Sequence, residues 1–363
     1  MKRNRGILFA AVLIITALGF CGGRLKEASD FQNEYTCVSI RFKTEGVTIE
    51  KLITALETEK KAGEQEFSGV TAWNWNNEEE VENPDINRKV KLPVLAAAGD
   101  MSLTAPMTLK SGNYVYAEDK EGCVMDSVTA FTLYGTDDAV GNTLIYQNRK
   151  YYVRGVVKTE SPLLLIQEAN TSIGYVNLEF DCRNREQAQT IAENFLLQNS
   201  FPQDYVIIDG YFYGKTMYSL FNLIIWILFV ITGLWLLQIL WKKRQELIRK
   251  NFYFDLVLGI FLMVGFGVIL YQLTGNPFYF PEKLLPTKVS DFDYWNRQYQ
   301  LLQEQLEQAR YLPPNMKDIH LENELMKLPR DILIMLLIYL ISVSQMRTAL
   351  KEKMNKTVIG GCK

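Results

Sequence analysis

A long uncharged stretch near the middle of the chain most constrains what the protein can fold into. Tyr218–Trp241 reads YSLFNLIIWILFVITGLWLLQILW and contains no Asp, Glu, Lys or Arg. As a helix, a stretch of this length crosses the roughly 30 Å hydrocarbon layer of a bilayer. Tyr218, Trp235 and Trp241 are aromatic residues of the kind that gather at membrane–water interfaces. The stretch therefore predicts a membrane span.

Three further apolar stretches predict three more spans. Gly6–Gly22 follows a basic N-terminal tip, which fits a cleaved signal peptide or a retained anchor. We expect an anchor, because other spans follow. Phe254–Leu273 is the third candidate. Ile332–Ser344 is short, and it spans if it extends to Met346 with local thinning of the bilayer; a re-entrant or surface helix is the alternative.

Basic residues set the predicted orientation of these four spans. They gather in the three segments that four spans would place on one side of the membrane. These residues are Lys2, Arg3, Arg5, Lys242, Lys243, Arg244, Arg249, Lys250, Arg347, Lys351, Lys353, Lys356 and Lys363. By the positive-inside rule that side is the cytoplasm. We therefore expect a multi-pass protein of the plasma membrane, with both termini cytoplasmic and its large domain outside.

The predicted spans divide the chain into eight segments. They are a cytoplasmic tip with the first span (1–23), an extracytoplasmic domain (24–216), the second span (217–241), a cytoplasmic loop (242–252), the third span (253–273), an extracytoplasmic loop with an amphipathic helix around Trp295–Tyr311 (274–330), the fourth span (331–346) and a cytoplasmic tail (347–363).

The 24–216 segment is long enough for a folded domain and mixes two periodicities. Tyr35–Lys43 alternates like a strand, with Val38, Ile40 and Phe42 on one face, whereas Val47–Lys61 has helical spacing. Further strands are expected at Val70–Trp75, Val90–Ala96, Leu144–Tyr146, Tyr151–Val157, Tyr175–Phe180 and Tyr205–Ile208, and helices at Thr129–Tyr134 (ending at Gly135) and Arg185–Asn199. The acidic run NNEEEVENPD is expected to be an exposed loop. The predicted fold is an α+β domain inserted between the first and second of four transmembrane helices.

The composition argues against several classes of function. A net charge of -2 does not favour a nucleic-acid binder, and five cysteines without a CxxC pair, beside a single histidine, do not favour a zinc site. A disulfide between Cys37 and Cys182 is one interpretation, and buried free thiols are the alternative. The sequence does not fix the pairing of Cys37, Cys123 and Cys182. We predict no metal and no cofactor.

Residues that suggest catalysis have simpler interpretations. Gly210–Thr216 (GYFYGKT) is one residue short of a phosphate-binding loop and leads directly into a predicted span. Asp119, Glu121 and Asp126 are close in sequence, where a turn or capping role is favoured. His320 is expected in a polar loop; it could be a ligand or a base, but a lone exposed histidine is more often neither. We predict no enzymatic activity.

One region resembles a known family. The carriers of this resemblance are Ser111-Gly112, Asp119, Gly122–Asp126, Ala130, Tyr134-Gly135, Val140-Gly141 and the hairpin that ends at Tyr151–Val157. They resemble the MacB-like periplasmic core domain found in membrane subunits of one class of ABC transporter, of the MacB/FtsX type. The resemblance is clearest over Leu109–Val157 and extends over Tyr35–Ile208. The glycines of this pattern serve turns and helix ends.

The resemblance implies a layout, a partner and a function. Family members have one span, a large outer domain and three more spans, and this chain is similar in that order. A separate cytoplasmic ATPase would supply energy for export or mechanical signalling, and two copies or one paralogous subunit would face the ATPase dimer. The chain departs from the family in its long 274–330 loop and in last spans without a family motif. A membrane-anchored extracellular binding or assembly protein is the alternative, and an ectoenzyme is a third hypothesis.

The basic 242–252 loop is the candidate docking site for that ATPase. The residues are Lys242, Lys243, Arg244, Arg249 and Lys250. Their charges could meet an acidic groove. The alternative is that they only set the topology.

Overall fold

The computed structural model describes residues 19–63, 66–159, 161–168, 174–246, 252–284, 288, 291–312 and 315–360. The chain divides into two compact units. We call Gln32–Gly214 with Glu282–Asn323 the sheet unit, and Met1–Phe31 with Lys215–Pro281 and Glu324–Lys363 the helical unit. The segment Glu282–Asn323 therefore belongs to the same unit as the domain that precedes the second predicted span.

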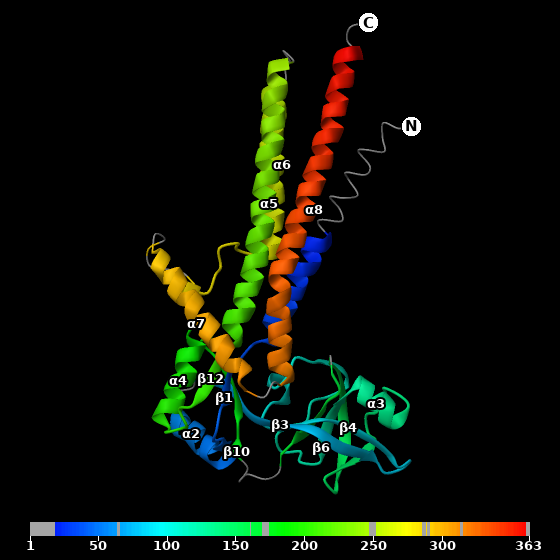
Figure 1. Ribbon diagram of the computed structural model, residues 1–363, viewed down its shortest axis with the longest axis vertical. Coiled ribbons are helices and arrows are strands. Elements are labelled where there is room, and N and C mark those ends of the chain that lie inside the picture. The colour runs from blue at the N-terminus through cyan, green and yellow to red at the C-terminus, as the bar shows by residue number, and fades with distance from the viewer. Residues whose placement is uncertain are drawn as a thin grey trace. The chain divides into compact units, whose positions relative to one another are not determined.

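A large mixed sheet organises the sheet unit (Figure 1). In spatial order its strands are β12 (Tyr205–Asp209), β1 (Val38–Phe42), β11 (Asn177–Cys182), β3 (Phe67–Asn83), β4 (Arg88–Ala98), β9 (Leu164–Gln167), β6 (Gly122–Asp126), β8 (Arg149–Lys158) and β5 (Thr108–Gly112), with β7 (Thr143–Tyr146) paired to β3 and β8. The strands β2 (Val47–Thr48) and β10 (Gly174–Tyr175) pair separately. The helices are α2 (Ile49–Ala62), α3 (Ser127–Tyr134), α4 (Ala188–Gln198), α7 (Phe292–Arg310) and the start of α8 (Met316–Gly360), with short 3₁₀ turns at Met101–Leu103, Arg185–Gln187 and Glu282–Leu284.

Local sequence explains where α3 begins and ends. The carboxylate of Asp126 accepts hydrogen bonds from the backbone N–H groups of Val128 and Thr129, which caps the first turn. Gly135 ends the helix with φ 76°, a left-handed conformation that favours glycine. The predicted helix and its end at Gly135 are confirmed. The capping role favoured for Asp126 is confirmed as well.

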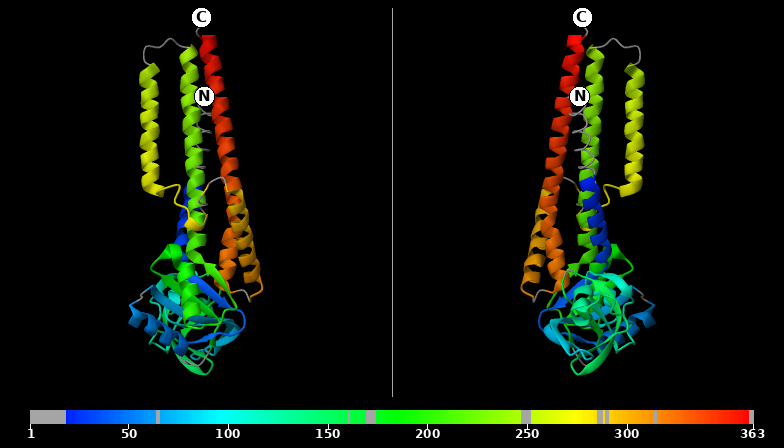
Figure 2. Two further views of the ribbon diagram at one scale, coloured as in Figure 1. Left: turned by 90° about the vertical axis from the view of Figure 1, so that its left-hand side faces the viewer. Right: turned by 90° about the vertical axis from the view of Figure 1, so that its right-hand side faces the viewer.

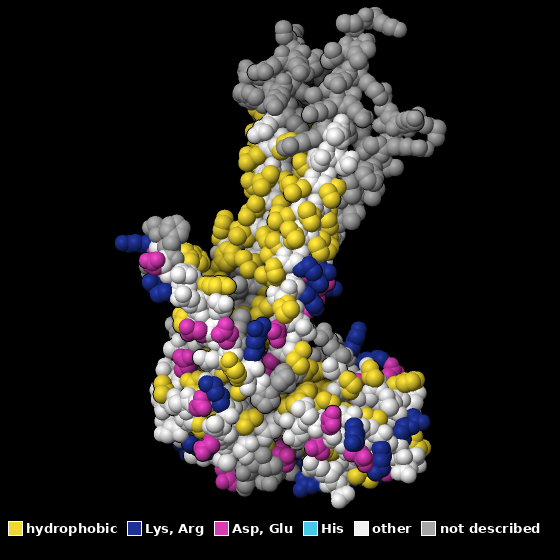
Figure 3. Space-filling model, in the orientation of Figure 1, with side chains coloured by type: hydrophobic (Ala, Val, Ile, Leu, Met, Phe, Trp, Pro, Cys, Tyr) yellow, Lys and Arg dark blue, Asp and Glu magenta, His cyan; other side chains and the backbone are white. Residues whose placement is uncertain are grey.

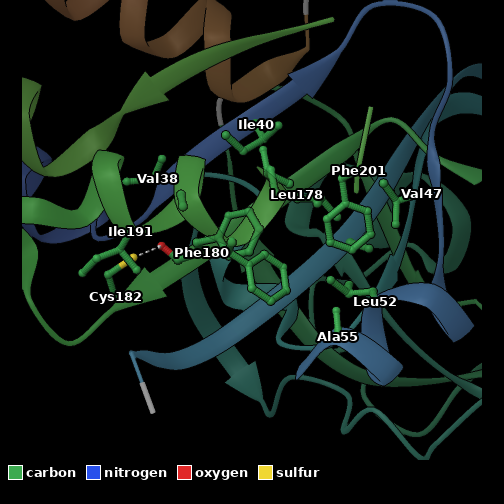
Figure 4. Packing of buried hydrophobic residues seen from close by; sticks show 14 of the residues in the cluster. Val38, Ile40, Val47, Leu52, Ala55, Leu178, Phe180, Cys182, Ile191 and Phe201 are labelled. Atoms are coloured by element: carbon green, nitrogen blue, oxygen red, sulfur yellow. Dashed lines mark hydrogen bonds between the residues drawn. The ribbon is translucent and has the colours of Figure 1, made fainter. Parts of the chain in front are cut away.

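The first core lies between α2, α4 and one face of the β1–β11–β3 end of the sheet. Val38, Ile40 and Phe42 are buried there, so the predicted inward face of this strand is confirmed. Figure 4 shows Val38 and Ile40 in the same cluster as Phe180 and Cys182. The aromatic rings of Phe67, Phe180, Phe195 and Phe201 pack against one another, with neighbouring centroids 5.1–5.6 Å apart.

Two further cores complete the unit. One packs α3 against the strands β4, β6, β7, β8 and β9. The other includes Trp73, Leu95, Met101 and Val124 from Gln32–Gly214, the part of the sheet unit that we call the sheet domain. It also includes Met316 from the start of α8. The sheet unit therefore buries side chains from both of its sequence segments in one core.

The acidic run predicted as a loop is a strand, so that prediction was wrong. β3 continues through it and pairs with β4, with Glu80 opposite Lys91 and Glu82 opposite Lys89. Lys89 Nζ lies 2.6 Å from a Glu80 oxygen and 3.5 Å from a Glu82 oxygen. Opposite charges across strands offset the weak strand propensity of glutamate. The predicted hairpin around Gln147–Lys150 is confirmed, since β7 and β8 pair directly.

The helical unit contains α5 (Gly210–Glu246, from Lys215 on), α6 (Phe252–Thr274) and most of α8, which are drawn as long helices in Figure 2. Among the described residues, Gly210–Trp235 and Leu256–Thr274 are long and apolar enough to cross a membrane, with mean hydropathy 2.1 and 2.3. They overlap the second (Tyr218–Trp241) and third (Phe254–Leu273) predicted spans, but their bounds differ. Figure 3 shows hydrophobic side chains gathered over this part. The fourth predicted span does not pass the same test, and most of the first lies outside the described residues.

Polar contacts tie the helices of this unit together. Near the end of α6, the Thr274 carbonyl accepts hydrogen bonds from Tyr218 Oη at 3.0 Å and from Asn222 Nδ2 at 2.9 Å. Thr232 of α5 donates from Oγ1 to Tyr339 Oη of α8 at 3.1 Å. The residues predicted as a fourth span therefore contact α5 through a side-chain hydrogen bond.

Gly112 and Gly135 provide a test of the backbone constraints. Both have positive φ (74° and 76°), but a Cβ at Gly112 would lie 2.1 Å from the carbonyl oxygen of Arg154, whereas one at Gly135 meets nothing within 4 Å. We expect Gly135→Ala to lower the free energy of unfolding by about 1–2 kcal/mol, the cost of left-handed backbone, and Gly112→Ala to lower it further. Thermal unfolding of the purified chain measures both. Equal losses would contradict the packing argument.

Candidate functional site: a buried ionic cluster that anchors the Glu282–Asn323 segment

A buried carboxylate lies on the face of the sheet opposite the first core. Ser39 pairs with Glu179 across β1 and β11. Because side chains alternate along strands, Cys37, Ser39, Arg41 and Glu179 share this face, while Val38 and its neighbours point to the first core. The side chain of Glu179 is completely buried (0% exposed).

Both oxygens of Glu179 are fully engaged. Oε1 accepts hydrogen bonds from Arg41 Nη1 at 2.8 Å and from Trp73 Nε1 at 3.0 Å. Oε2 accepts from Ser39 Oγ at 2.5 Å, Cys37 Sγ at 3.1 Å and Lys317 Nζ at 2.7 Å. The guanidinium of Arg41 also lies over the Trp73 ring, 4.9 Å from its centroid. We call Cys37, Ser39, Arg41, Trp73, Glu179 and Lys317 the ionic cluster.

Lys317 brings the second sequence segment into this cluster. It is the second residue of α8 and is almost fully buried. Its Nζ also lies 2.9 Å from the Leu103 carbonyl oxygen and 3.0 Å from Cys37 Sγ. Next to it, Asp318 accepts a hydrogen bond from Arg41 at 3.4 Å. Two cations thus face two carboxylates, and this balance allows the charges to be buried.

The electrostatics keep the cluster ionised. Burial alone would raise the pKa of Glu179, but the positive charges of Lys317 and Arg41 outweigh it and hold the pKa at about 2. Burial would lower the pKa of Lys317, and its Cys37 and Glu179 neighbours raise it instead. Burial raises the pKa of Cys37 to about 12, so Cys37 is a neutral thiol. A buried neutral thiol is a poor nucleophile.

Residues next to Lys317 at the start of α8 make further contacts within the sheet unit. The Asn315 side chain accepts a hydrogen bond from the Asp318 backbone N–H at 2.8 Å and so caps the helix. Tyr35 donates from Oη to the Lys317 carbonyl at 2.8 Å. The His320 ring stacks on Tyr35, with centroids 5.9 Å apart, and lies 3.4 Å from a Glu34 oxygen. The first turn of α8 is therefore fixed through several side chains at once.

The other end of the same segment is fastened at the start of α5. Lys283 Nζ lies 2.8 Å from Asp209 Oδ2 and 2.9 Å from Gln189 Oε1. The other oxygen of Asp209 accepts from the Phe212 backbone N–H and caps α5. Tyr294 of α7 donates to the Lys283 carbonyl at 2.6 Å. Glu282–Asn323 is thus held to the sheet domain near both of its ends.

The chain also passes from β12 to α5 without a loop. Asp209 ends the strand and Gly210 begins the helix. The Gly210 N–H donates to the Cys37 carbonyl, and a Cβ at Gly210 would lie 2.6 Å from the same oxygen. This close approach requires glycine. The GYFYGKT motif is therefore helical, which rules out the phosphate-loop interpretation.

The geometry of the ionic cluster suits a structural role, in which it holds α8 against the sheet, better than a catalytic one. The oxygens of Glu179 are occupied by donors from its own chain. Among the described residues no group of three or more His, Cys, Asp and Glu is placed to hold a metal ion. What the cluster does is fix the start of α8 to three strands of the sheet.

The structure places the predicted cysteines, His320 and Asp119 as follows. Of the two interpretations for Cys37 and Cys182, buried free thiols hold and the disulfide does not: both are free, and the register places them on opposite faces of the sheet, Cys182 in the first core (Figure 4) and Cys37 in the ionic cluster. Cys123 is also free and buried. His320 lies in α8 and not in a loop. Asp119 pairs with Arg154 at 2.9 Å.

The predicted docking residues lie at the edge of what the structure describes. Lys242, Lys243 and Arg244 fall in the last turns of α5, which extends further than the predicted second span, and their side chains lie outside the described part. Arg249 and Lys250 lie outside the described residues. ATPase docking through these residues stays a prediction.

Sequence reasoning missed the ionic cluster. The available signal was that Ser39 and Arg41 alternate with the predicted apolar face, which places them together on the other face of the strand. The pattern does not show that this face is covered, because the covering residue, Lys317, is distant in sequence.

Comparisons with known proteins give structural likenesses, of which two are described here. No family model and no curated protein matches the chain. The crystal structure of the periplasmic region of MacB from Actinobacillus actinomycetemcomitans is similar at 14% identity and a TM-score of 0.39, covering 48% of this chain and 89% of that one. The extracellular domain of the noncanonic ABC-type transporter YknZ from Gram-positive bacteria is similar at 11% identity and a TM-score of 0.37, covering 47% and 99%. Likenesses at these scores do not assign the chain to a family.

Removing Lys317 tests the anchoring role. Lys317→Met leaves the Glu179 carboxylate buried with one cation fewer, and breaking such pairs costs about 3–5 kcal/mol. We expect faster proteolytic cleavage of the full chain within Glu282–Asn323 and a lower unfolding temperature. Lys110→Met, at an exposed ion pair with Asp137, is the matched control and should change little. Similar behaviour of the two variants would contradict anchoring by Lys317.

The pKa of Glu179 predicts an acid transition. Because its pKa is about 2 in the folded chain against an ordinary 4.5, its contribution is present above pH 4.5 and is lost as the pH falls toward 2. The shift corresponds to about 3 kcal/mol. We expect Glu179→Gln to be destabilised at pH 7 and to lose less further stability between pH 4.5 and 2 than the parent chain. Unfolding midpoints across this pH range measure it, and parallel curves would exclude the assignment.

Proposed function

We propose that the chain is the membrane subunit of a MacB-like ABC system, which couples a separate cytoplasmic ATPase to a domain outside the cell. The work would be export or mechanical signalling, and the chain itself would have no enzymatic activity. The observation that carries the proposal is the double fastening of Glu282–Asn323, by Lys317 to Glu179 and by Lys283 to Asp209. The sequence resemblance over Leu109–Val157 supports the same proposal.

The fastening matters because of where the segment lies in the chain. It connects the third and fourth predicted spans, whereas the sheet domain connects the first and second. A displacement of the fourth span relative to the second would therefore pull on the contacts of Lys317 and Lys283 inside the sheet unit. Rigid elements joined without loops transmit such a displacement instead of absorbing it. The direct β12–α5 connection has this property, whereas α8 contains Pro329.

An ion pair within the helical unit supports a bundle in which the first and fourth predicted spans move together. Arg24 Nη1 lies 3.2 Å from Asp331 Oδ2, which joins the helical residues 19–34 to α8. These two residues are the predicted outer ends of the first and fourth spans. Their pairing agrees with a topology in which both ends lie on the same side of the membrane.

The alternative is a membrane-anchored extracellular binding or assembly protein without transport. The observation that favours it is that Glu282–Asn323 forms part of the sheet unit, an addition that the family resemblance does not include. Such a protein would need no cytoplasmic ATPase. The presence or absence of that partner therefore separates the two functions.

Affinity purification of the full chain from membranes tests the proposal. We expect it to retain an ATPase with a Walker A motif encoded beside its own gene. We expect the triple variant with Lys242, Lys243 and Arg244 changed to Glu to reduce retention at least tenfold, because positive charges at this loop would meet an acidic groove. The matched control reverses Arg347, Lys351 and Lys353 in the tail and should retain the ATPase.

The outcomes separate the docking site from the function. If the parent chain retains no such ATPase, the transporter proposal fails. If the parent and both variants retain it equally, the function stands and the docking residues are wrong. Loss in both variants would show a general effect of cytoplasmic charge and would likewise remove the assignment to Lys242, Lys243 and Arg244.

A further inference from the structure

A short loop with exposed aromatic side chains follows α6 in the helical unit. We call Asn276–Pro281 the aromatic loop. The helix before it ends at Thr274, and Gly275 follows in the left-handed conformation with φ 71°. In the loop, Phe278 is 73% exposed and Tyr279 is 59% exposed. Two large aromatic rings therefore contact whatever surrounds the helical unit at this point.

Hydrogen bonds fix the backbone of the aromatic loop. Asn276 Oδ1 accepts from the Phe278 backbone N–H at 2.9 Å, and the Phe278 carbonyl accepts from the Phe280 N–H at 3.0 Å. The Tyr279 carbonyl accepts from Ser219 Oγ of α5 at 2.6 Å. The backbone is thus held on both sides of Phe278, which fixes the direction in which its ring points.

The end of α6 and the loop are also tied to α5 through side chains. Trp226 donates from Nε1 to Thr274 Oγ1 at 3.2 Å. Lys215 Nζ lies over the ring of Tyr279, 3.7 Å from its centroid. Lys215 and Trp226 are roughly 16 Å apart along α5, so the contacts extend over about three turns of that helix. The aromatic loop therefore has a defined position relative to both helices.

The surface of α6 indicates what surrounds these rings. Leu256–Thr274 has a mean hydropathy of 2.3, and its most apolar part is not buried inside the protein. Tyr271 and Leu273 in its last turn are exposed as well. A helix that is apolar on all sides requires an apolar environment such as a bilayer. The aromatic loop begins where this apolar surface ends.

The length of α6 places the loop at the boundary of such a bilayer. Leu256–Thr274 comprises 19 residues. As a helix it is about 28 Å long, close to the roughly 30 Å thickness of the hydrocarbon layer. Little apolar helix is left to project beyond the hydrocarbon, so the residues that follow Thr274 lie at the level of the lipid headgroups.

We propose that Phe278 and Tyr279 contact the phospholipid headgroup region of the outer leaflet, and that the aromatic loop thereby sets how deep the end of α6 lies in the bilayer. Aromatic side chains favour this region because their rings meet both an apolar and a hydrated environment there. The inference rests on the topology in the proposed function, in which α5 and α6 cross the membrane. It does not depend on the ATPase or on transport.

Depth-dependent fluorescence quenching of the full chain in phosphatidylcholine nanodiscs tests the contact. Phe278→Cys carries an environment-sensitive fluorophore and is compared with Leu262→Cys, in the middle of α6, and with Tyr116→Cys, at an exposed tyrosine of the sheet unit. The parent chain gives the background from native cysteines. We expect lipids with a nitroxide near the headgroup to quench the Phe278 label at least about twofold more than lipids with a nitroxide deep in the acyl chains. The Leu262 label should show the reverse order, and the Tyr116 label should respond only to an aqueous quencher.

The outcomes separate the lipid contact from the topology. If the Leu262 label is quenched by lipid but the Phe278 label behaves like the Tyr116 label, the proposal is overturned and the membrane crossing of α6 stands. Shielding of the Phe278 label from both lipid and aqueous quenchers would show that protein covers the loop, which also overturns the proposal. If lipid does not quench the Leu262 label, α6 does not cross the membrane, and the proposed topology fails together with the contact.

Removing the two rings tests the effect on depth. In a chain with Phe278→Ser and Tyr279→Ser, we expect a water-soluble maleimide to modify Leu273→Cys at least about fivefold faster than it does beside the native loop, because the end of α6 has lost its interfacial contact. Tyr311→Ser, at an exposed tyrosine of the sheet unit, is the matched control and should leave the rate unchanged. A native-like unfolding temperature shows that each chain has folded. Equal rates with and without the two rings would exclude a role of the loop in setting the depth.

Discussion

Glu179 places a full negative charge where no water reaches it, in the middle of β11, and the arrangement around it follows from that fact. An unpaired buried carboxylate costs so much free energy that the chain must surround it with donors. Those donors come from β1, from β3 and from α8. A slip of one residue in the β1–β11 register would turn Glu179 into the first core, among Val38, Phe180 and Cys182. The carboxylate therefore fixes strand register and the position of α8 together.

The same interaction connects the architecture to the proposed function. A hydrophobic contact tolerates sliding, whereas an ion pair with five donors has one geometry. Lys317 at one end of Glu282–Asn323 and Lys283 at the other thus define where the segment sits on the sheet domain. Between them lies α7.

Local patterns in the sequence predicted the local structure well. Alternation placed Val38, Ile40 and Phe42 in a core, and Gly135 marked the end of α3, because both depend on neighbouring residues only. The acidic part of β3 was missed because glutamate has low strand propensity, and its compensation by Lys89 and Lys91 is visible only once the partner strand is known. The long hydrophobic spans were predicted from composition, and two of them appear as apolar helices.

Local sequence patterns could not predict the ionic cluster. Nothing near Glu179 in the sequence shows that Lys317 neutralises it, and nothing near Cys37 shows that it faces away from Cys182. Both facts follow from pairing between distant segments. His320 was assigned to a loop, whereas it lies in the second turn of α8, which Asn315 caps.

The distance between Glu179 and Lys317 along the chain, 138 residues, imposes an order on biosynthesis. At roughly 5–20 residues per second, a ribosome needs about 7–28 s to add the lysine after the glutamate. During that interval α5 and α6 are made, and the face bearing Ser39, Arg41 and Glu179 stays hydrated. Only a nascent polypeptide that has been extended through both helices can close it. A product that ends before Lys317 therefore leaves the Glu179 carboxylate without this cation.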